Sequence, residues 1–295
     1  MFFQGKDLPV FKAALHNHST VSDGQFKPEE IIRIYAEKKF DIFAFSDHRK
    51  TNDISQYDSG GMTLIAGIEL HPAGPHGTTW HLLALNVPVD FPGEFSTAQE
   101  AVDAVNNAGG IIFCAHPEWC GITAEDIAAI DGFAGLEVYN TSCRYNAKES
   151  SESVWNELTD RGIIYPALAV DDTHSSAEFF GGWTMIAAED KSPESIMRAI
   201  AQGSFYATQG PEFTRLNYEN GIFEAEFSEV EEVVLVGIRS LGDCIASPNY
   251  PEYGNTPLKT GFKLDIANHR YLKNAPFRCR IRDSRGRYAW TPIFR

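Results

Sequence analysis

Two histidines and an acid stand close together near the N-terminus, in His16-Asn17-His18-Ser19-Thr20-Val21-Ser22-Asp23. Residues i and i+2 of a strand point to the same face, so His16 and His18 could hold one metal ion together. Asp23, in the turn that would follow the strand, could hold a second ion. A polar strand end with two solvated histidines would give the same short pattern, so the motif is weighed together with the rest of the chain.

Further histidines and acids recur at the ends of apolar runs. In a parallel barrel the carboxyl ends of the strands converge on one face, and active sites lie there. A buried ring of unpaired carboxylates and imidazoles is costly to desolvate, and metal ions are the natural compensation. Mixed His, Asp and Glu ligands suit Zn²⁺, Mn²⁺ or Fe²⁺. The residues at these positions are Asp47, His48, Glu69, His81 (which begins its run), His116, Asp171, Asp172 and His174, and Glu137 and Asn140 lie on the sixth run.

The elements that would position these residues alternate between apolar runs and helical patterns, from residue 12 to about residue 205. Several runs are apolar throughout, as buried parallel strands are. The alternation predicts an α/β fold with a parallel sheet, and the number of units suits a distorted barrel of the TIM type. The expected strands are 11–18, 41–48, 63–70, 81–87, 110–117, 135–140, 164–174 and 183–188.

Three expected helices have recognisable ends. Pro28 stands at a first-turn position before an amphipathic run. Ser96-Thr97-Ala98-Gln99 is typical of a capping box, and that helix would stop at Gly109. Ser192-Pro193-Glu194 would open a helix that ends at Gly203.

The pattern changes after Gly210-Pro211. Short apolar runs follow one another without a strong helical pattern, and Asn220-Gly221 and Arg285-Gly286 are turn signals. We therefore expect a barrel over residues 1–210 and a small all-β domain over residues 211–295, packed away from the metal site. The short strands are expected at 216–218, 222–227, 233–239, 262–267, 277–283 and 288–292.

Composition excludes some classes of function. The chain of 295 residues has 43% hydrophobic residues, which is typical of a globular protein with a sizeable core. Its net charge of −15 disfavours binding of nucleic acid polymers, although clustered cations can locally attract a smaller anion. No apolar run reaches the roughly 18 residues of a membrane span. The five cysteines form no CxxC pair, and the N-terminus shows no secretory pattern, so we expect a cytoplasmic protein that acts away from membranes.

The order His-x-His, Ser-Asp-His, Gly-x-Glu, a later His, Ala-His-Pro and Asp-x-His, over roughly residues 11–210, resembles the polymerase and histidinol phosphatase (PHP) superfamily. The resemblance implies a distorted (β/α)7 barrel of TIM-like type, two or three divalent metal ions and hydrolysis of phosphoesters. Asp23 stands where many members have histidine, which leaves the number of ions open. The implied ligands are His16, His18, Glu69 and Asp172 for one ion, Asp23, His48 and His174 for a second, and Glu69, His81 and His116 for a third or a bridged pair.

A narrower resemblance involves residues 199–211 and 285–293. These segments are similar to the PHP branch named for carbaryl hydrolase, whose members carry a C-terminal β module. This likeness implies an architecture and does not identify a substrate.

The leading hypothesis is a phosphoesterase that uses a metal-bridging hydroxide on a small phosphorylated metabolite or nucleotide. Arg49 and Arg144 could grip phosphate oxygens, or they could be solvated surface charges. Asp47 could orient His48, or it could cap a turn. The alternatives are a carbamate, ester or lactone hydrolase with the same metal centre, and a non-catalytic, metal-stabilised binding protein.

Two further histidines lie in a loop rich in proline and glycine after Glu69. We interpret His71 and His76 as loop residues, although either could take the place of His81 as a ligand.

Overall fold

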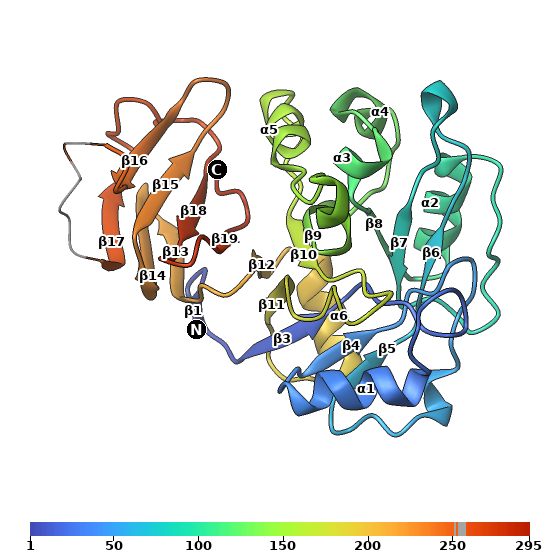
Figure 1. Ribbon diagram of the computed structural model, residues 1–295. Coiled ribbons are helices and arrows are strands. Elements are labelled where there is room, and N and C mark those ends of the chain that lie inside the picture. Colours follow the sequence, from blue (N-terminus) through green and yellow to red (C-terminus); the bar gives the residue numbers. More distant parts are fainter. Residues whose placement is uncertain (251, 253–257) are drawn as a thin grey trace.

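The computed structural model describes residues 1–250, 252 and 258–295. Strands β13 to β18 group on the left in Figure 1, and the helices and the remaining longer strands lie to their right. The strands of the first part are β3 (Val10–Ala14), β4 (Ile42–Ala44), β5 (Thr63–Ile65), β6 (Gly67–Leu70), β7 (Leu82–Leu85), β8 (Ile111–Cys114), β9 (Gly135–Asn140), β10 (Ala167–Val170), β11 (Trp183–Ala187) and β12 (Phe205–Thr208).

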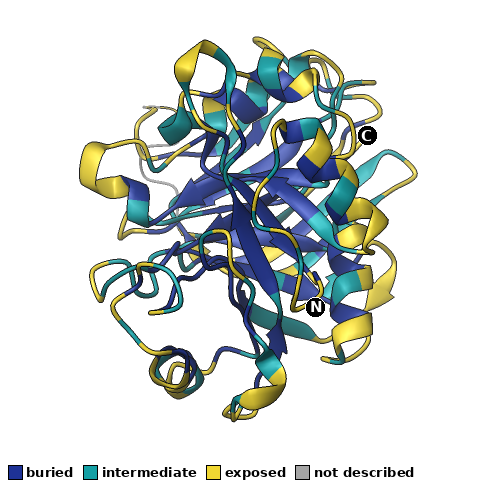
Figure 2. Ribbon diagram, turned by 90° about the vertical axis from the view of Figure 1, so that its right-hand side faces the viewer, coloured by how far each residue is buried: buried dark blue, intermediate teal, exposed yellow. Residues whose placement is uncertain are grey.

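Helices connect several of these strands, and their exposed residues face outward while the strands are buried in the interior (Figure 2). Helix α1 begins at Pro28 as expected, and the Ser192 hydroxyl caps α6 by accepting from the Ser195 amide. The capping box of α2 joins Thr97 to Glu100, one residue later than the sequence suggested. The helices are α1 (Pro28–Glu37), α2 (Ala98–Asn107), α3 (Pro117–Cys120), α4 (Ala124–Ala128), α5 (Glu152–Asp160) and α6 (Pro193–Ala201), with 3₁₀ turns η1 (Ile54–Gln56), η2 (Pro75–Gly77) and η3 (Ser142–Asn146).

Two sheets carry the first part of the chain, with orders β10-β9-β8-β7-β6 and β16-β15-β18-β19-β12-β11-β3-β4-β5. Isolated bridges join them, His48 with Glu69 and Asn17 with Thr173. Gly67 permits the close approach beside the first bridge, because a Cβ there would lie 2.5 Å from the Phe45 carbonyl oxygen. The fold is thus a mixed α/β fold of several sheets, and the expected TIM-like barrel is not confirmed.

Strand direction corrects one expectation. Strand β7 runs antiparallel to both β6 and β8, and β11 runs antiparallel to β3, so the sheets are not parallel throughout. Leu82, at the start of β7, pairs with Leu70, at the end of β6. The start of β7 therefore lies at the same edge as the carboxyl ends of the parallel strands, and this places His81 at that edge.

The last part of the chain is all-β among the described residues. Asn220 and Gly221 form the turn between β13 and β14 with φ of 51° and 77°, as two-residue hairpins require. Strand β16 was not expected from the sequence. The strands are β13 (Phe213–Glu219), β14 (Ile222–Val230), β15 (Glu232–Val236), β16 (Gly242–Ala246), β17 (Lys259–Asp265), β18 (Arg278–Arg282) and β19 (Tyr288–Trp290).

The two ends of the chain join both parts. The N-terminal strands β1 (Phe2–Phe3) and β2 (Lys6–Asp7) extend the sheet β17-β14-β13, and Phe2 pairs in parallel with Arg215. Strand β19 pairs with β12, so one sheet runs continuously from β16 to β5. The division at residue 210 falls between β12 and β13 and stays a prediction.

Within the described ranges, no helix combines the length and the apolar character needed to cross a bilayer.

Candidate metal centre

The predicted ligands gather at one edge of the two sheets. They lie after β3, β4, β8 and β10, on β6 and just before β7. Contacts between their carboxylate oxygens and imidazole nitrogens range from 2.7 to 3.7 Å. The structure brings together His16, His18, Asp23, His48, Glu69, His81, His116, Asp172 and His174.

Glu69, on β6, is fully buried at the middle of this group. Its Oε1 lies 2.8 Å from His81 Nδ1 and 3.3 Å from His116 Nε2. Its Oε2 lies 2.7 Å from His48 Nδ1 and 3.5 Å from His18 Nε2. The two oxygens thus face imidazoles from different strand ends, an arrangement in which one carboxylate can bridge two ions.

Two aspartates complete the group. Asp172 Oδ1 lies 3.0 Å from His18 Nε2 and 3.3 Å from His16 Nε2. Asp23 approaches from the other side, with its oxygens 3.3 Å from His48 Nε2 and 3.6 Å from His174 Nε2. These contacts agree with the first two ligand groups that the family resemblance implies, but they do not test the assignment.

Several of these atoms are buried without a hydrogen-bond partner among the described residues. Such groups normally carry a heavy desolvation cost, so their convergence requires a compensating partner. Imidazole and carboxylate donors fit a divalent transition metal ion. Two of the sets with ligand atoms within 4.8 Å of one another are His16, His18 and Glu69, and His18, Asp23, His48 and His174. The orphaned atoms include His16 Nε2, both ring nitrogens of His18, His48 Nδ1, Glu69 Oε2 and Asp172 Oδ1.

Burial and mutual charge set the protonation of the metal-free cluster. Burial opposes a charge on His16, but Asp172, Glu137 and Glu69 together raise its pKa well above the usual value. Burial lowers the pKa of His18 to about 4. Burial also opposes the charge on Glu69, yet His81 and His16 hold its pKa well below the usual value. Protons and metal cations would therefore compete for the same carboxylates and imidazoles of this cluster.

A second layer of residues orients the ligands. Glu137 Oε1 lies 2.7 Å from His16 Nδ1, and its Oε2 accepts from the His116 amide at 3.0 Å. Asn140 donates to Glu137 and to Asp172. With Nδ1 of His16 facing a carboxylate, Nε2 is the nitrogen turned toward the centre.

Asp47 holds the loop that carries Asp23. Its carboxylate is fully buried and accepts from the amides and hydroxyls of Ser19 and Ser22 and from the Asn52 side chain. Gly24 closes the loop, because a Cβ there would lie 2.5 Å from the His18 carbonyl oxygen. No hydrogen bond joins Asp47 to His48 in the described part of the chain, and its expected role in orienting His48 stays a prediction.

Comparison with known proteins bears on the fold. No family model and no curated protein sequence match the chain. A two-domain protein from Bacteroides vulgatus, described as containing a predicted PHP-like metal-dependent phosphoesterase, covers 100% of this chain and 98% of its own. The TM-score is 0.55 and the identity 15%. The chain shares this PHP-like fold.

An amidohydrolase from Chromobacterium violaceum, solved with bound sulfate and no metal, matches 65% of this chain and 96% of its own at 17% identity and a TM-score of 0.50. At such identities the likeness concerns the fold alone. The Bacteroides match supports the PHP resemblance at the level of the fold, and neither match supports the narrower likeness to the carbaryl-hydrolase branch.

A pocket of about 260 Å³ opens beside the ligand cluster of the PHP-like fold. Its outer wall includes Trp119 and Tyr145, whose polar tips are joined by a 3.1 Å hydrogen bond. No lysine or arginine lines the pocket in the described ranges. Arg49 pairs with Glu94, and Arg144 donates to the carbonyl oxygens of residues 141 and 177. Their expected phosphate contacts stay predictions.

The sequence analysis named His71 only as a loop residue that could take the place of His81. Its side chain is only 6% exposed and lies among the ligands, whereas His76 in the same loop is 76% exposed and lies 3.9 Å from Asp126. His71 follows Glu69 by two residues, the same spacing that singled out His16 and His18. That signal was available, but the prolines and glycines of the segment suggested a surface loop.

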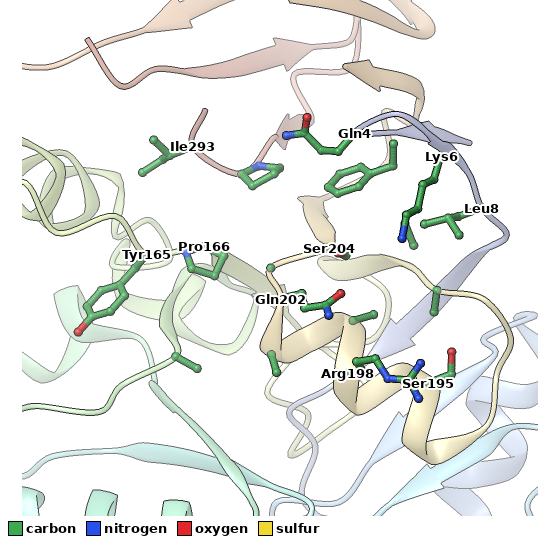
Figure 3. A pocket seen from close by; sticks show the side chains of 18 of the residues that line it. Gln4, Lys6, Leu8, Tyr165, Pro166, Ser195, Arg198, Gln202, Ser204 and Ile293 are labelled. Carbon is green, nitrogen blue, oxygen red and sulfur yellow. The ribbon is translucent and has the colours of Figure 1, made fainter. Parts of the chain in front are cut away.

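A larger cavity of about 770 Å³ lies elsewhere in the PHP-like fold, between the N-terminal hairpin, α6 and the C-terminal end of the chain (Figure 3). Lys6 and Arg198 are among its lining residues, and Arg198 pairs with Glu189. None of the predicted ligands lines it, so its size does not make it the site of metal chemistry.

Proposed function

We propose that this protein is a metal-dependent hydrolase and that its substrates are small phosphoesters. The observation that carries the proposal is the convergence of orphaned buried imidazole and carboxylate atoms beside an open pocket. The described activity of the Bacteroides neighbour, a predicted phosphoesterase, supports the choice of reaction. Two or three ions of Zn²⁺, Mn²⁺ or Fe²⁺ would satisfy these donors.

The ligand assignment follows the three groups implied by the PHP resemblance. Such ions lower the pKa of a bound water and clamp the oxygens of a displacement at phosphorus. The residues proposed to hold them are His16, His18, Glu69 and Asp172, then Asp23, His48 and His174, and finally Glu69 with His81 and His116.

The other residues of the site would keep this arrangement in place. Glu137 fixes the ring of His16, so Nε2 is presented to the centre. Asp47 fixes the loop of Asp23. The pocket beside them has room for a small ester, and Trp119 and Tyr145 form its outer side.

The second candidate is hydrolysis of a carbamate, ester or lactone by the same centre. The observation that favours it is the lack of lysine and arginine among the pocket residues that the structure describes. A phosphoesterase of this design would depend on the metal ions alone to neutralise the phosphate, or on Arg49 or Arg144 after a change of partner.

Other features belong to the proposal as well. We interpret the two bridged sheets as the distorted (β/α)7 barrel of the PHP type. We propose that the protein is cytoplasmic and acts on a small phosphorylated molecule. We also propose that it binds neither a nucleic acid polymer nor a membrane. Its net charge of −15 supports the exclusion of nucleic acid polymers.

The deciding experiment measures turnover of metal-depleted protein after reconstitution with Zn²⁺, Mn²⁺ or, anaerobically, Fe²⁺. Phosphomonoesters, cyclic phosphates and aryl carbamates serve as substrates. We expect the metal-loaded protein to release phosphate from phosphomonoesters or to cleave cyclic phosphates. This activity should be lost when a chelator is added and in His16→Ala. Turnover of carbamates alone would select the second candidate, and full activity of the metal-depleted protein would rule out both.

A further inference from the structure

We propose that His71 is an additional metal ligand, which acts with Glu69 and His48 and which the PHP resemblance does not supply. The inference rests on the metal centre of the proposed function, but it is independent of whether the substrate is a phosphoester.

The first argument is the position of the ring. His71 Nε2 lies 3.3 Å from Glu69 Oε2, the oxygen that also faces His48 Nδ1 at 2.7 Å. Ligand atoms of these three residues lie within 4.8 Å of one another, as one ion requires. The His71 ring centroid is 4.6 Å from that of His48 and 4.3 Å from that of His81, so it is surrounded by other candidate ligands.

The second argument is the unsatisfied chemistry of that atom. His71 Nε2 is buried and has no hydrogen-bond partner among the described residues, and the same holds for Glu69 Oε2 and His48 Nδ1. Glu69 Oε2 and His48 Nδ1 contact each other at 2.7 Å, whereas His71 Nε2 has only the 3.3 Å contact with Glu69 Oε2 and carries a desolvation cost that a shared cation would offset.

The third argument is the order of the loop. The Trp80 amide donates to the Pro72 carbonyl at 3.0 Å, and the Gly74 amide donates to the Thr78 carbonyl at 2.9 Å. These bonds close the segment on itself directly after His71. The chain is thus held in place next to His71, whereas His76, which lies inside the closed loop, is 76% exposed.

The consequence is a centre richer in imidazole than the family pattern alone implies. An additional imidazole ligand beside Glu69 Oε2 favours binding of Zn²⁺ and Fe²⁺ over harder ions such as Mg²⁺, which prefer oxygen ligands. His71 would thereby tune which metal the protein takes up.

The test uses the full chain after metal removal, titrated with Co²⁺ alone and without substrate. His71→Ala and the more conservative His71→Asn are compared with His76→Ala, a histidine of the same loop that lies outside the cluster. Even residues that only orient ligands typically contribute about 10–100-fold to metal affinity. We expect His71→Ala to weaken Co²⁺ binding at least about tenfold, or to remove one equivalent, and to change the visible Co²⁺ spectrum. His76→Ala should match the wild type.

Equal affinity and an unchanged spectrum in His71→Ala would overturn the proposal, and so would an equal loss in His76→Ala. Circular dichroism of the metal-free variants checks that they are folded. If His71→Ala does not fold, His71→Asn gives the same comparison. Because no substrate is present, a failure of phosphoesterase activity leaves these results unaffected.

Discussion

Glu69 shows how far single residues could be interpreted from the sequence. Its place at the end of an apolar run predicted that it would meet His16 and His18, and the structure places all three in contact. His71 obeys the same spacing rule relative to Glu69, but a rule for strands was not applied to a segment that looked like a loop. The direction of a side chain just past a strand depends on loop hydrogen bonds, which composition does not specify.

Glu137 provides a direct test of how ligands are positioned. Glu137→Gln keeps the size of the side chain but removes the charge that faces His16 Nδ1 at 2.7 Å. We expect metal affinity to fall about 10–100-fold, because outer partners of this kind orient the ring and increase its basicity. Equilibrium dialysis with Zn²⁺ measures the change. Glu125→Gln, at an exposed carboxylate, is the control and should bind as the wild type does.

The raised pKa of His16 predicts a pH dependence for metal uptake. Burial opposes its charge, but Asp172, Glu137 and Glu69 outweigh this effect, so the metal-free ring stays protonated above its unfolded pKa. A histidine must lose its proton to bind a metal, so affinity should rise with pH, by up to about tenfold per unit for each proton displaced.

The stability of the metal-free protein should change in the opposite direction. A raised folded pKa contributes stability that is fully present below the unfolded pKa of about 6.5 and is lost as pH rises through the folded pKa.

For metal uptake, calorimetric titration with the metal ion in buffers of different ionisation enthalpy measures how many protons are released on binding. Binding without any proton release would show that His16 is already neutral.

At the scale of elements, strand β7 explains why His81 belongs to the cluster although it precedes its strand. Periodicity predicts that a strand exists but not its direction, and the antiparallel pairing with β6 was not foreseen. Two other candidate ligands have unusual backbone conformations: His116 has a φ of 26° and Asp172 a φ of 54°. Non-glycine residues with positive φ tend to persist where the surrounding structure holds them for a function.

The loop between β3 and α1 supplies a test at this scale. Asp47→Ala removes the acceptor of several buried donors, among them the Ser19 amide and the Asn52 side chain. We expect a loss of at least about 2 kcal/mol in the free energy of unfolding, because each unsatisfied donor costs about 1–3 kcal/mol. Asp23 would also lose its position, so the number of bound metal equivalents should fall.

Urea unfolding and metal analysis measure the two effects of Asp47→Ala. Asp58→Ala is the control, since that exposed carboxylate accepts from the Gly60 amide of its own turn and, among the described residues, from no other donor. A variant that kept its stability and all its metal would show that the loop is held by other contacts.

At the scale of the whole molecule, the predicted strands of the last part are largely present, because alternation and turn residues mark them locally. The pairing of β1 with β13 was not predicted, since strands so far apart in the sequence carry no signal of each other. The continuous sheet across β12 and β19 was missed for the same reason.

Arg278 joins the two parts and provides the test at this scale. Its guanidinium is buried, lies 4.1 Å from the Trp155 ring centroid and donates to Asn156 at 2.6 Å. Burial lowers its pKa to about 10. Arg278→Ala should reduce the free energy of unfolding by about 2–3 kcal/mol through the lost packing and hydrogen bond. Urea unfolding measures this, with the exposed Arg285→Ala as control; a change no larger than that of the control would mean that the two parts are held together elsewhere.

The pairing of β1 with β13 has a consequence for the order of events during synthesis. Phe2 and Phe3 leave the ribosome well before their partners Arg215 and Leu216 are made. At about 5–20 residues per second, a separation of about 200 residues means a wait on the order of 10–40 s. Phe3, which is 6% exposed in the finished protein, lacks its β13 partner throughout that interval. The nascent chain therefore has an apolar segment available to chaperones while the residues between β1 and β13 are made.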